Sequence, residues 1–256
     1  MAAPVDVRVE GSCLVITIDR PKARNAVSPE VAQGLEAAVD RLEADPQLRV
    51  GILTGVPPIF CSGADLKAVG AGRGGELVTE RGGFAGFVRR ERSKPIIAAV
   101  DGPALAGGLE IILACDLVVA SQQATFSVPE VKRGLIASGG ALLRLGDRLP
   151  PHIAMEMVLT GDPISAQVAE RYGLVNVLCA PGTVLEEALA LAERITRNGP
   201  LAVFLSRQVL LASRDLPERE GWELSDDANR QVQASEDVQE GVRAFIEKRP
   251  PEWTGR

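Results

Sequence analysis

Two glutamates stand in positions where a carboxylate needs either a partner or a task. Glu110 lies inside the apolar run Leu109-Glu-Ile-Ile-Leu-Ala114, and Glu130 follows Pro129 twenty residues further on. Burying a carboxylate among apolar side chains costs free energy unless it is paired. Two carboxylates in one dry site separate their pKa values, so one can act as an acid while the other acts as a base. We therefore predict that both glutamates face one small cavity and move protons there.

Each glutamate taken alone also has a purely structural interpretation. Glu110 could be a core residue bonded to a helix terminus or to an arginine. Glu130 could be a carboxylate that the positive end of a helix dipole favours. Their joint presence favours proton chemistry over two separate structural roles.

Two small-residue turns could supply the groups that stabilise a developing negative charge. Gly63-Ala64 and Ala106-Gly107 could each leave a backbone N–H pointing into a cavity. Gly107 would start the apolar helix, where free N–H groups and the positive dipole end lie together. Two such donors would form an oxyanion hole for a carbonyl that becomes an enolate. Tight packing of a strand on a helix selects the same small residues, and spacing alone does not separate the two interpretations.

Basic residues flank the predicted mouth of the cavity. Lys22, Arg24 and Lys67 are suited to binding phosphate, although they also favour solubility. Residues 70–75 match G-x-G-x-x-G literally. We discount this match as a dinucleotide site because no strand immediately precedes it and Arg73-Gly-Gly is a poor start for a helix.

Composition narrows the possible functions. The 256 residues, 46% of them hydrophobic, suffice for one sizeable core. A net charge of −6 argues against nucleic acid as a partner. The four scattered cysteines are typical of reduced cytoplasmic thiols, and the single histidine, His152, leaves little from which to build a multi-histidine metal site. No apolar run reaches membrane-spanning length and the N-terminus does not read as a signal peptide, so we expect no membrane association.

The strands and helices that must position these residues are expected to follow an α/β pattern. Alternating residues 5–10 predict a strand, and a short turn at Gly11-Ser12 joins it to a second predicted strand over 13–19, so we expect a hairpin. Ser28 predicts the start of a helix that ends before Pro46. The nearly all-apolar residues 95–100 predict a strand that is buried on both faces. Residues 68–83 are glycine-rich, which predicts a mobile segment, and a helix is expected over 84–92. Further helices are expected over 183–197, 200–213 and about 217–247.

Several ordered motifs at matching spacings give the chain a family resemblance. The motifs are Arg20-Pro-Lys-Ala-Arg-Asn-Ala26, Phe60-Cys-Ser-Gly-Ala-Asp-Leu66, Ala104-Leu-Ala-Gly-Gly-Leu-Glu110, Cys115-Asp116, Phe126-Ser-Val-Pro-Glu130 and Phe245-Ile-Glu-Lys-Arg249. With them the sequence resembles the enoyl-CoA hydratase/isomerase, or crotonase, superfamily over nearly its whole length.

The resemblance implies a fold and an assembly. The fold class would be α/β, a crotonase-like spiral of ββα units over residues 1–195 that carries the active site, with a helical C-terminal trimerisation region over 196–256. The chain would form a homotrimer or a hexamer of two trimers in the cytoplasm. Its substrate would be an acyl-CoA thioester, with coenzyme A as part of the substrate and no metal or redox cofactor.

The resemblance also implies roles for individual residues. The backbone N–H groups of Ala64 and Gly107 would bind the thioester oxygen, Glu110 would orient and activate water, and Glu130 would supply a proton to the α-carbon. The residues implied to bind CoA or substrate are Lys22, Ala23, Arg24, Ala26, Ser62, Asp65, Leu66 and Lys67, with Phe245 and Lys248 reaching the CoA of a neighbouring subunit.

The activity expected from this resemblance is the addition of water to a 2-enoyl-CoA, as in fatty acid β-oxidation. Two alternatives stay open: another reaction of the superfamily, such as double-bond isomerisation or dehydration of carnitinyl-CoA, and a CoA-ester-binding protein without turnover. The chain departs from its relatives at Ala137-Ser-Gly-Gly-Ala141, over the reacting end of the acyl group. We expect this departure to affect acyl specificity and the geometry of the water.

Overall fold

A β-hairpin opens the fold of the computed structural model, which describes residues 3–256. Strands β1 (Val5–Glu10) and β2 (Cys13–Ile18) pair antiparallel, and Glu10 lies opposite Cys13. Gly11 turns the chain between them with φ +58°, a conformation that favours glycine. The predicted hairpin is confirmed.

The hairpin is one edge of a six-stranded sheet. The strand order is β1-β2-β3-β6-β8-β11, and every pair after the hairpin is parallel. The four further strands are β3 (Val50–Gly55), β6 (Ile96–Val100), β8 (Leu117–Ser121) and β11 (Val177–Cys179). All five residues of β6 are buried, as predicted for a strand that is covered on both faces.

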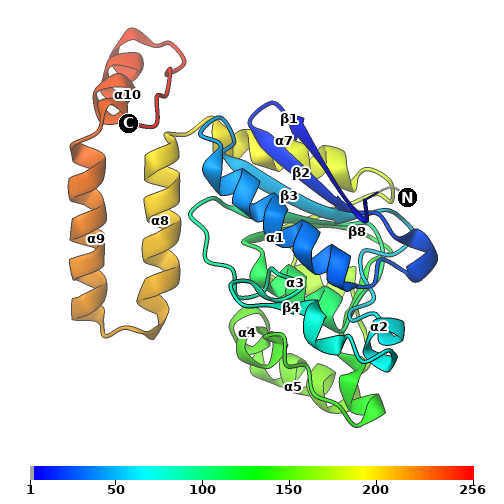
Figure 1. The fold of residues 1–256 in the computed structure, drawn as a ribbon. Helices are drawn as coiled ribbons and strands as arrows, with labels where there is room; N and C mark the ends of the chain where they lie inside the picture. Colours follow the sequence, from blue (N-terminus) through cyan, green and yellow to red (C-terminus); the bar gives the residue numbers. More distant parts are fainter. Residues whose placement is uncertain (1–2) are drawn as a thin grey trace.

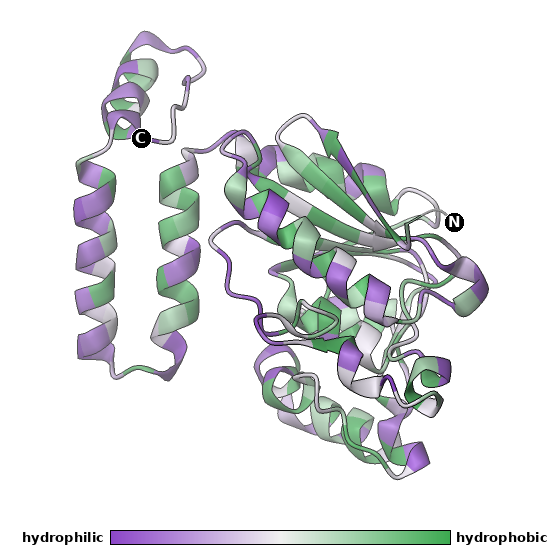
Figure 2. Cartoon of the chain, viewed as in Figure 1, coloured by the Kyte–Doolittle hydropathy of each residue, from purple (hydrophilic) through white to green (hydrophobic). Residues whose placement is uncertain are grey.

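Helices cover both faces of this sheet. Helices α1 (Pro29–Ala44) and α3 (Gly107–Ala114) contribute to the larger core on one face, and α7 (Val184–Thr196) packs with the second core on the other (Figures 1 and 2). Alternate residues along each strand serve the two cores because successive side chains point to opposite faces. Helix α1 starts where Ser28 accepts a hydrogen bond from the N–H of Val31 at 3.3 Å, which confirms the predicted N-cap.

A second, three-stranded sheet brings the two catalytic candidates together. Strands β7 (Ala104–Leu105) and β9 (Thr125–Ser127) run parallel, and β10 (Ile164–Ser165) pairs with β9. Strand β7 leads into α3, which carries Glu110, and β9 leads into the 3₁₀ turn η3 (Pro129–Arg133), which carries Glu130. Because parallel strands end at the same edge, both carboxylates emerge on one side of this sheet.

The segment before β6 lacks the helix predicted for it. Residues 68–83 hold regular elements, and the helix expected over 84–92 is absent: residues 85–89 form turns. Gly86 has φ +63°, and a Cβ there would lie 2.3 Å from the carbonyl oxygen of Ala32 on α1. This close backbone approach, which the local sequence does not reveal, keeps the segment out of a helix. The elements are α2 (Leu66–Gly70), η2 (Gly74–Leu77), β4 (Val78–Thr79) and β5 (Gly83–Phe84).

The C-terminal part is helical and partly detached from the core. Helices α8 (Pro200–Ala212) and α9 (Glu218–Gln233) form an antiparallel arm, with α10 (Glu236–Glu247) at the end of the arm where α8 begins (Figure 1). The helix expected over 217–247 is two helices, because Ser235 caps α10 by accepting from the N–H of Val238 at 3.3 Å. The remaining elements are η1 (Pro21–Ala23), α4 (Ala141–Arg148), α5 (Pro151–Thr160), α6 (Ala166–Arg171) and η4 (Ser213–Asp215).

Residues 3–256 also bear on what the sequence predicts about membrane-spanning helices and about the cysteines. No helix in this part of the chain combines the length and apolar character needed to cross a lipid bilayer. All four cysteines are buried and free.

Candidate active site

Glu110 and Glu130 line the same pocket, which has a volume of about 970 Å³. Glu110 is only 4% exposed, and burial raises the pKa of both carboxyls. The charge of Glu110 raises the pKa of Glu130 further, because two like charges in one pocket repel each other. A pair of carboxyls with raised pKa values in one cavity is suited to acid–base catalysis.

The N-terminus of α4 holds the side chain of Glu110. The N–H of Ala141 donates to Oε1 of Glu110 at 3.2 Å. Burial raises the pKa of Glu110, whereas the N–H groups of Ala141 and Gly139 and the charge of Arg144 act against that rise. Glu110 therefore has the predicted structural role of bonding to a helix terminus, and it also lines the pocket. The bond fixes one oxygen and leaves the carboxylate on the pocket wall.

Glu130 has one oxygen without a partner. Its Oε2 is buried and forms no hydrogen bond to any other residue in the described part of the chain. A buried carboxylate oxygen without a bond is costly, so its retention at a pocket wall favours a role that involves a bound molecule. This acceptor lies on the pocket that Glu110 also lines.

The two small-residue turns lie against each other. A Cβ placed on Gly63 would be 2.9 Å from Cβ of Ala106 and 3.0 Å from the backbone nitrogen of Gly107. Ala64 and Gly107 both line the pocket, and within residues 3–256 neither backbone N–H donates to another backbone carbonyl. Ala106 adopts φ 52° and ψ −128°, a strained conformation for a residue with a side chain. This strain turns the chain so that α3 starts at the pocket, and two free donors result.

The loop at the pocket mouth is fixed by a buried amide. Asn25 is fully buried and donates from Nδ2 to the carbonyls of Val56 at 2.8 Å and Ile59 at 2.6 Å. Its Oδ1 accepts from the N–H of Arg20 at 2.9 Å. These bonds tie the loop 20–26 to the chain that leaves β3. The basic residues of the loop, Lys22 and Arg24, therefore lie beside the motif at residues 60–66.

All eight predicted CoA-binding residues in the first part of the chain line this pocket. They are Lys22, Ala23, Arg24, Ala26, Ser62, Asp65, Leu66 and Lys67. The carboxylate of Asp65 is engaged in the fold, since it pairs with Arg20 at 2.9 Å and accepts from the N–H of Lys67 at 3.0 Å. We therefore expect Asp65 to shape the mouth through these bonds.

Two predicted binding residues are not brought to this pocket. Phe245 and Lys248 belong to the end of α10, on the arm away from the core (Figure 1). The side chain of Phe245 is 85% exposed. Contact with the CoA of a neighbouring subunit remains a prediction for both residues.

Sequence reasoning missed the part of the wall that faces Glu110. A Cβ on Gly139 would lie 2.4 Å from Oε2 of Glu110, so only glycine leaves the carboxylate in place. Residues 137–141 were expected to lie over the reacting end of the acyl group, and Ser138 and Gly139 do line the pocket, but nothing in the sequence revealed the contact of Gly139 with Glu110. Phe84 was also missed: a Cβ on Gly107 would lie 2.4 Å from its ring. Leu77, Val78, Leu135 and Ile136 complete an apolar wall.

Comparison with known proteins places this site within a family. The family described as "Enoyl-CoA hydratase/isomerase" matches residues 8–256. Carnitinyl-CoA dehydratase from Proteus mirabilis (strain HI4320) is 38% identical over 262 residues, covering 100% of both chains.

Solved structures agree with this match. The crystal structure of an enoyl-CoA hydratase from Mycobacterium tuberculosis H37Rv has a TM-score of 0.97 and 48% identity, with 100% of both chains covered. A carnitinyl-CoA hydratase from Mycobacterium avium has a TM-score of 0.78 and 43% identity, also with 100% of both chains covered. The predicted α/β crotonase-like fold is confirmed, and the predicted hydratase-type lyase agrees with the names of these relatives. The chain belongs to the enoyl-CoA hydratase/isomerase family.

Proposed function

We propose that the chain is an enoyl-CoA hydratase that adds water across the double bond of a 2-enoyl-CoA thioester. The observation that carries the proposal is one pocket that holds two carboxyls with raised pKa values and two free backbone N–H groups. A family member that only bound CoA esters would not need both acids. The relatives named above support the reaction class.

The proposed mechanism assigns each group one step. The N–H groups of Ala64 and Gly107 bind the thioester oxygen and stabilise the enolate-like transition state. Glu110 and Glu130 hold one water molecule between them. The hydroxyl of this water bonds to the β-carbon, and its remaining proton reaches the α-carbon through Glu130, so no other reactant is consumed. Lys22, Arg24 and Lys67 bind the phosphates of CoA at the mouth.

The acyl end of the pocket favours an uncharged chain over a carnitinyl group. Its wall is formed by apolar residues, and the only aromatic ring among the lining residues in the described chain is Phe84. The guanidinium of Arg89 also lines the pocket. A quaternary ammonium is best bound by several aromatic faces and is repelled by a nearby guanidinium. Dehydration of carnitinyl-CoA, suggested by the names of two relatives, is therefore our second candidate.

A turnover panel tests the choice. Crotonyl-CoA, a longer 2-enoyl-CoA, a 3-enoyl-CoA and carnitinyl-CoA are assayed with the same enzyme preparation. We expect loss of the conjugated thioester absorbance with the 2-enoyl esters only. Turnover of carnitinyl-CoA at a higher kcat/KM would replace our first candidate by the second. A Glu110→Gln, Glu130→Gln double variant with wild-type turnover would refute both.

Three further properties belong to the same proposal. We propose a role in fatty acid β-oxidation, assembly into trimers or hexamers through the C-terminal helices, and a cytoplasmic location. Exposed apolar residues on the arm and on α10, among them Trp222 at 62% and Ile246 at 72%, support the assembly. Analytical ultracentrifugation of the full chain tests it, and a monomer at micromolar concentration would contradict it.

A further inference from the structure

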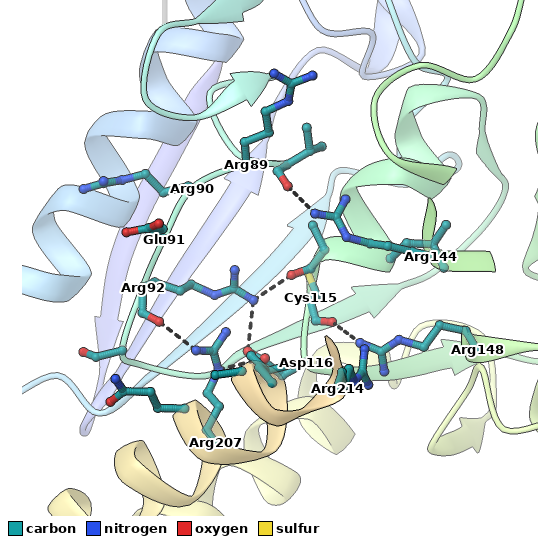
Figure 3. Close-up of a pocket in the computed structure, with 17 residues that line it drawn as sticks. Arg89, Arg90, Glu91, Arg92, Cys115, Asp116, Arg144, Arg148, Arg207 and Arg214 are labelled. Carbon is teal, nitrogen blue, oxygen red and sulfur yellow. Dashed lines mark hydrogen bonds and ion pairs between the residues drawn. The ribbon is translucent and has the colours of Figure 1, made fainter. Parts of the chain in front are cut away.

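A second cavity, separate from the mouth of the active site, is lined by arginines. It has a volume of about 810 Å³ and lies between the C-terminal half of α8, the segment 88–93 and helices α3 and α4 (Figure 3). Seven arginines and only two carboxylates, Glu91 and Asp116, line it, which gives the wall a formal charge of +5. The arginines are Arg89, Arg90, Arg92, Arg144, Arg148, Arg207 and Arg214.

Asp116, one of the two carboxylates in this cavity, already pairs with two arginines. Asp116 accepts from Arg92 at 3.0 Å and from Arg207 at 2.8 Å. Arg144 donates to the carbonyl of Val88 at 2.7 Å, and Arg148 donates to the carbonyl of Cys115 at 3.3 Å. Neither Arg144 nor Arg148 has a carboxylate partner within residues 3–256. Arg90 pairs with Asp40 at 2.6 Å and Arg214 with Asp147 at 3.7 Å, both outside the lining. The carboxylates of the described chain therefore neutralise only part of the positive charge around the cavity, and Arg144 and Arg148 account for the excess.

The excess charge is costly to the fold. Arg144 and Arg148 stand four residues apart on one helix, a spacing at which like charges repel. Burial lowers the pKa of both guanidiniums, and neighbouring arginines lower it further. The side chain of Arg92 is only 6% exposed, and its Nε is buried without a hydrogen-bond partner in the described chain. Such a cluster is stable when an anion supplies the missing charge and acceptors.

We propose that this cavity is a binding site for a small, multiply charged oxyanion of the phosphate class. The planar forks of Arg144 and Arg148 match the geometry of phosphoryl oxygens, and the Nε of Arg92 supplies a buried donor. The cavity adjoins the active site, since Val88 and Arg89 line both pockets. Arg144 also stands on α4, whose N-terminus holds Glu110. Occupancy of the arginine cavity therefore stabilises the helix that positions Glu110.

The test is a calorimetric titration of pyrophosphate into the full chain saturated with coenzyme A, at constant ionic strength. Saturation fills the basic mouth, so pyrophosphate must bind elsewhere. We expect one pyrophosphate per chain. An Arg148→Gln, Arg214→Gln double variant should bind about 100-fold more weakly, on the order of tenfold for each lost guanidinium. Arg194→Gln on α7, which lies outside the cavity lining, serves as the matched control and should bind as the wild type does.

Arg148→Lys keeps the positive charge but removes the planar guanidinium, and it provides a second test in case the double variant does not fold. It should bind with intermediate affinity if the site recognises phosphoryl geometry. Citrate, a polycarboxylate of similar charge, should bind more weakly than pyrophosphate. Equal affinity of the wild type and the double variant would overturn the proposal. Absence of pyrophosphate binding by the wild type would also overturn it. Dissociation of the double variant in sedimentation would then show that carboxylates of a second copy fill the cavity.

Discussion

Gly139→Ala tests whether the wall opposite Glu110 positions the catalytic carboxylate. The new Cβ would lie 2.4 Å from Oε2 and 2.8 Å from Cδ of Glu110, whereas ordinary contacts begin at 3.4 Å. Gly139 does not have positive φ, so alanine fits its backbone. The carboxylate is the end of a side chain and can yield, but it must move by about 1 Å. A displacement of this size costs about 100-fold in rate.

The assay compares kcat for crotonyl-CoA hydration with thermal unfolding of the same preparation. We expect kcat to fall on the order of 100-fold while Tm changes by less than about 2 °C, because the strain is relieved by motion of one side chain. Gly146→Ala on α4, the helix that follows Gly139, is the matched control, since its Cβ would meet nothing within 4 Å. It should keep full activity and gain about 0.5–1 kcal/mol of stability from higher helix propensity.

A double-mutant cycle separates the positioning of Glu110 from obstruction of the substrate. If Gly139→Ala acts through Glu110, it should lower the rate no further in a Glu110→Gln background. If the new methyl group blocks the acyl chain, the 100-fold loss should persist in that background. Persistence of the loss, or wild-type activity of the single variant, would refute the reasoning.

Three other predictions follow from the same geometry. Glu130→Gln should lower kcat by 100-fold or more. Because burial raises the pKa of Glu130 above 4.5, the folded protein loses stability as pH rises through that pKa; chemical denaturation should therefore show the variant more stable than the wild type at pH 8 and equal to it below about pH 4. The acidic limb of the wild-type kcat profile should have its midpoint above the ordinary value of 4.5, because the pKa of Glu110 is also raised; a midpoint at or below 4.5 would contradict this. Asn25→Ala should destabilise the fold by about 3 kcal/mol or more, since it leaves the carbonyls of Val56 and Ile59 unpaired; a loss below 1 kcal/mol in urea unfolding would contradict this.

The sequence by itself determined the features that depend on local chemistry. Alternation predicted the opening hairpin, Ser28 predicted the start of α1, and the apolar run at 95–100 predicted a strand covered on both faces. The spacing of several motifs predicted the family. Each of these signals resides in residues that are close along the chain or in an ordered set of short segments.

Only the tertiary structure decided what surrounds the two acids. The helix expected over 84–92 does not form, because Gly86 packs against the backbone of α1, a contact between segments more than fifty residues apart. The support of Glu110 comes from Gly139 and Ala141, about thirty residues away, and the arginine cavity collects side chains from four separate segments. Such sites arise when parallel strands end at one edge and their helices pack together, so no single stretch of sequence carries their signal.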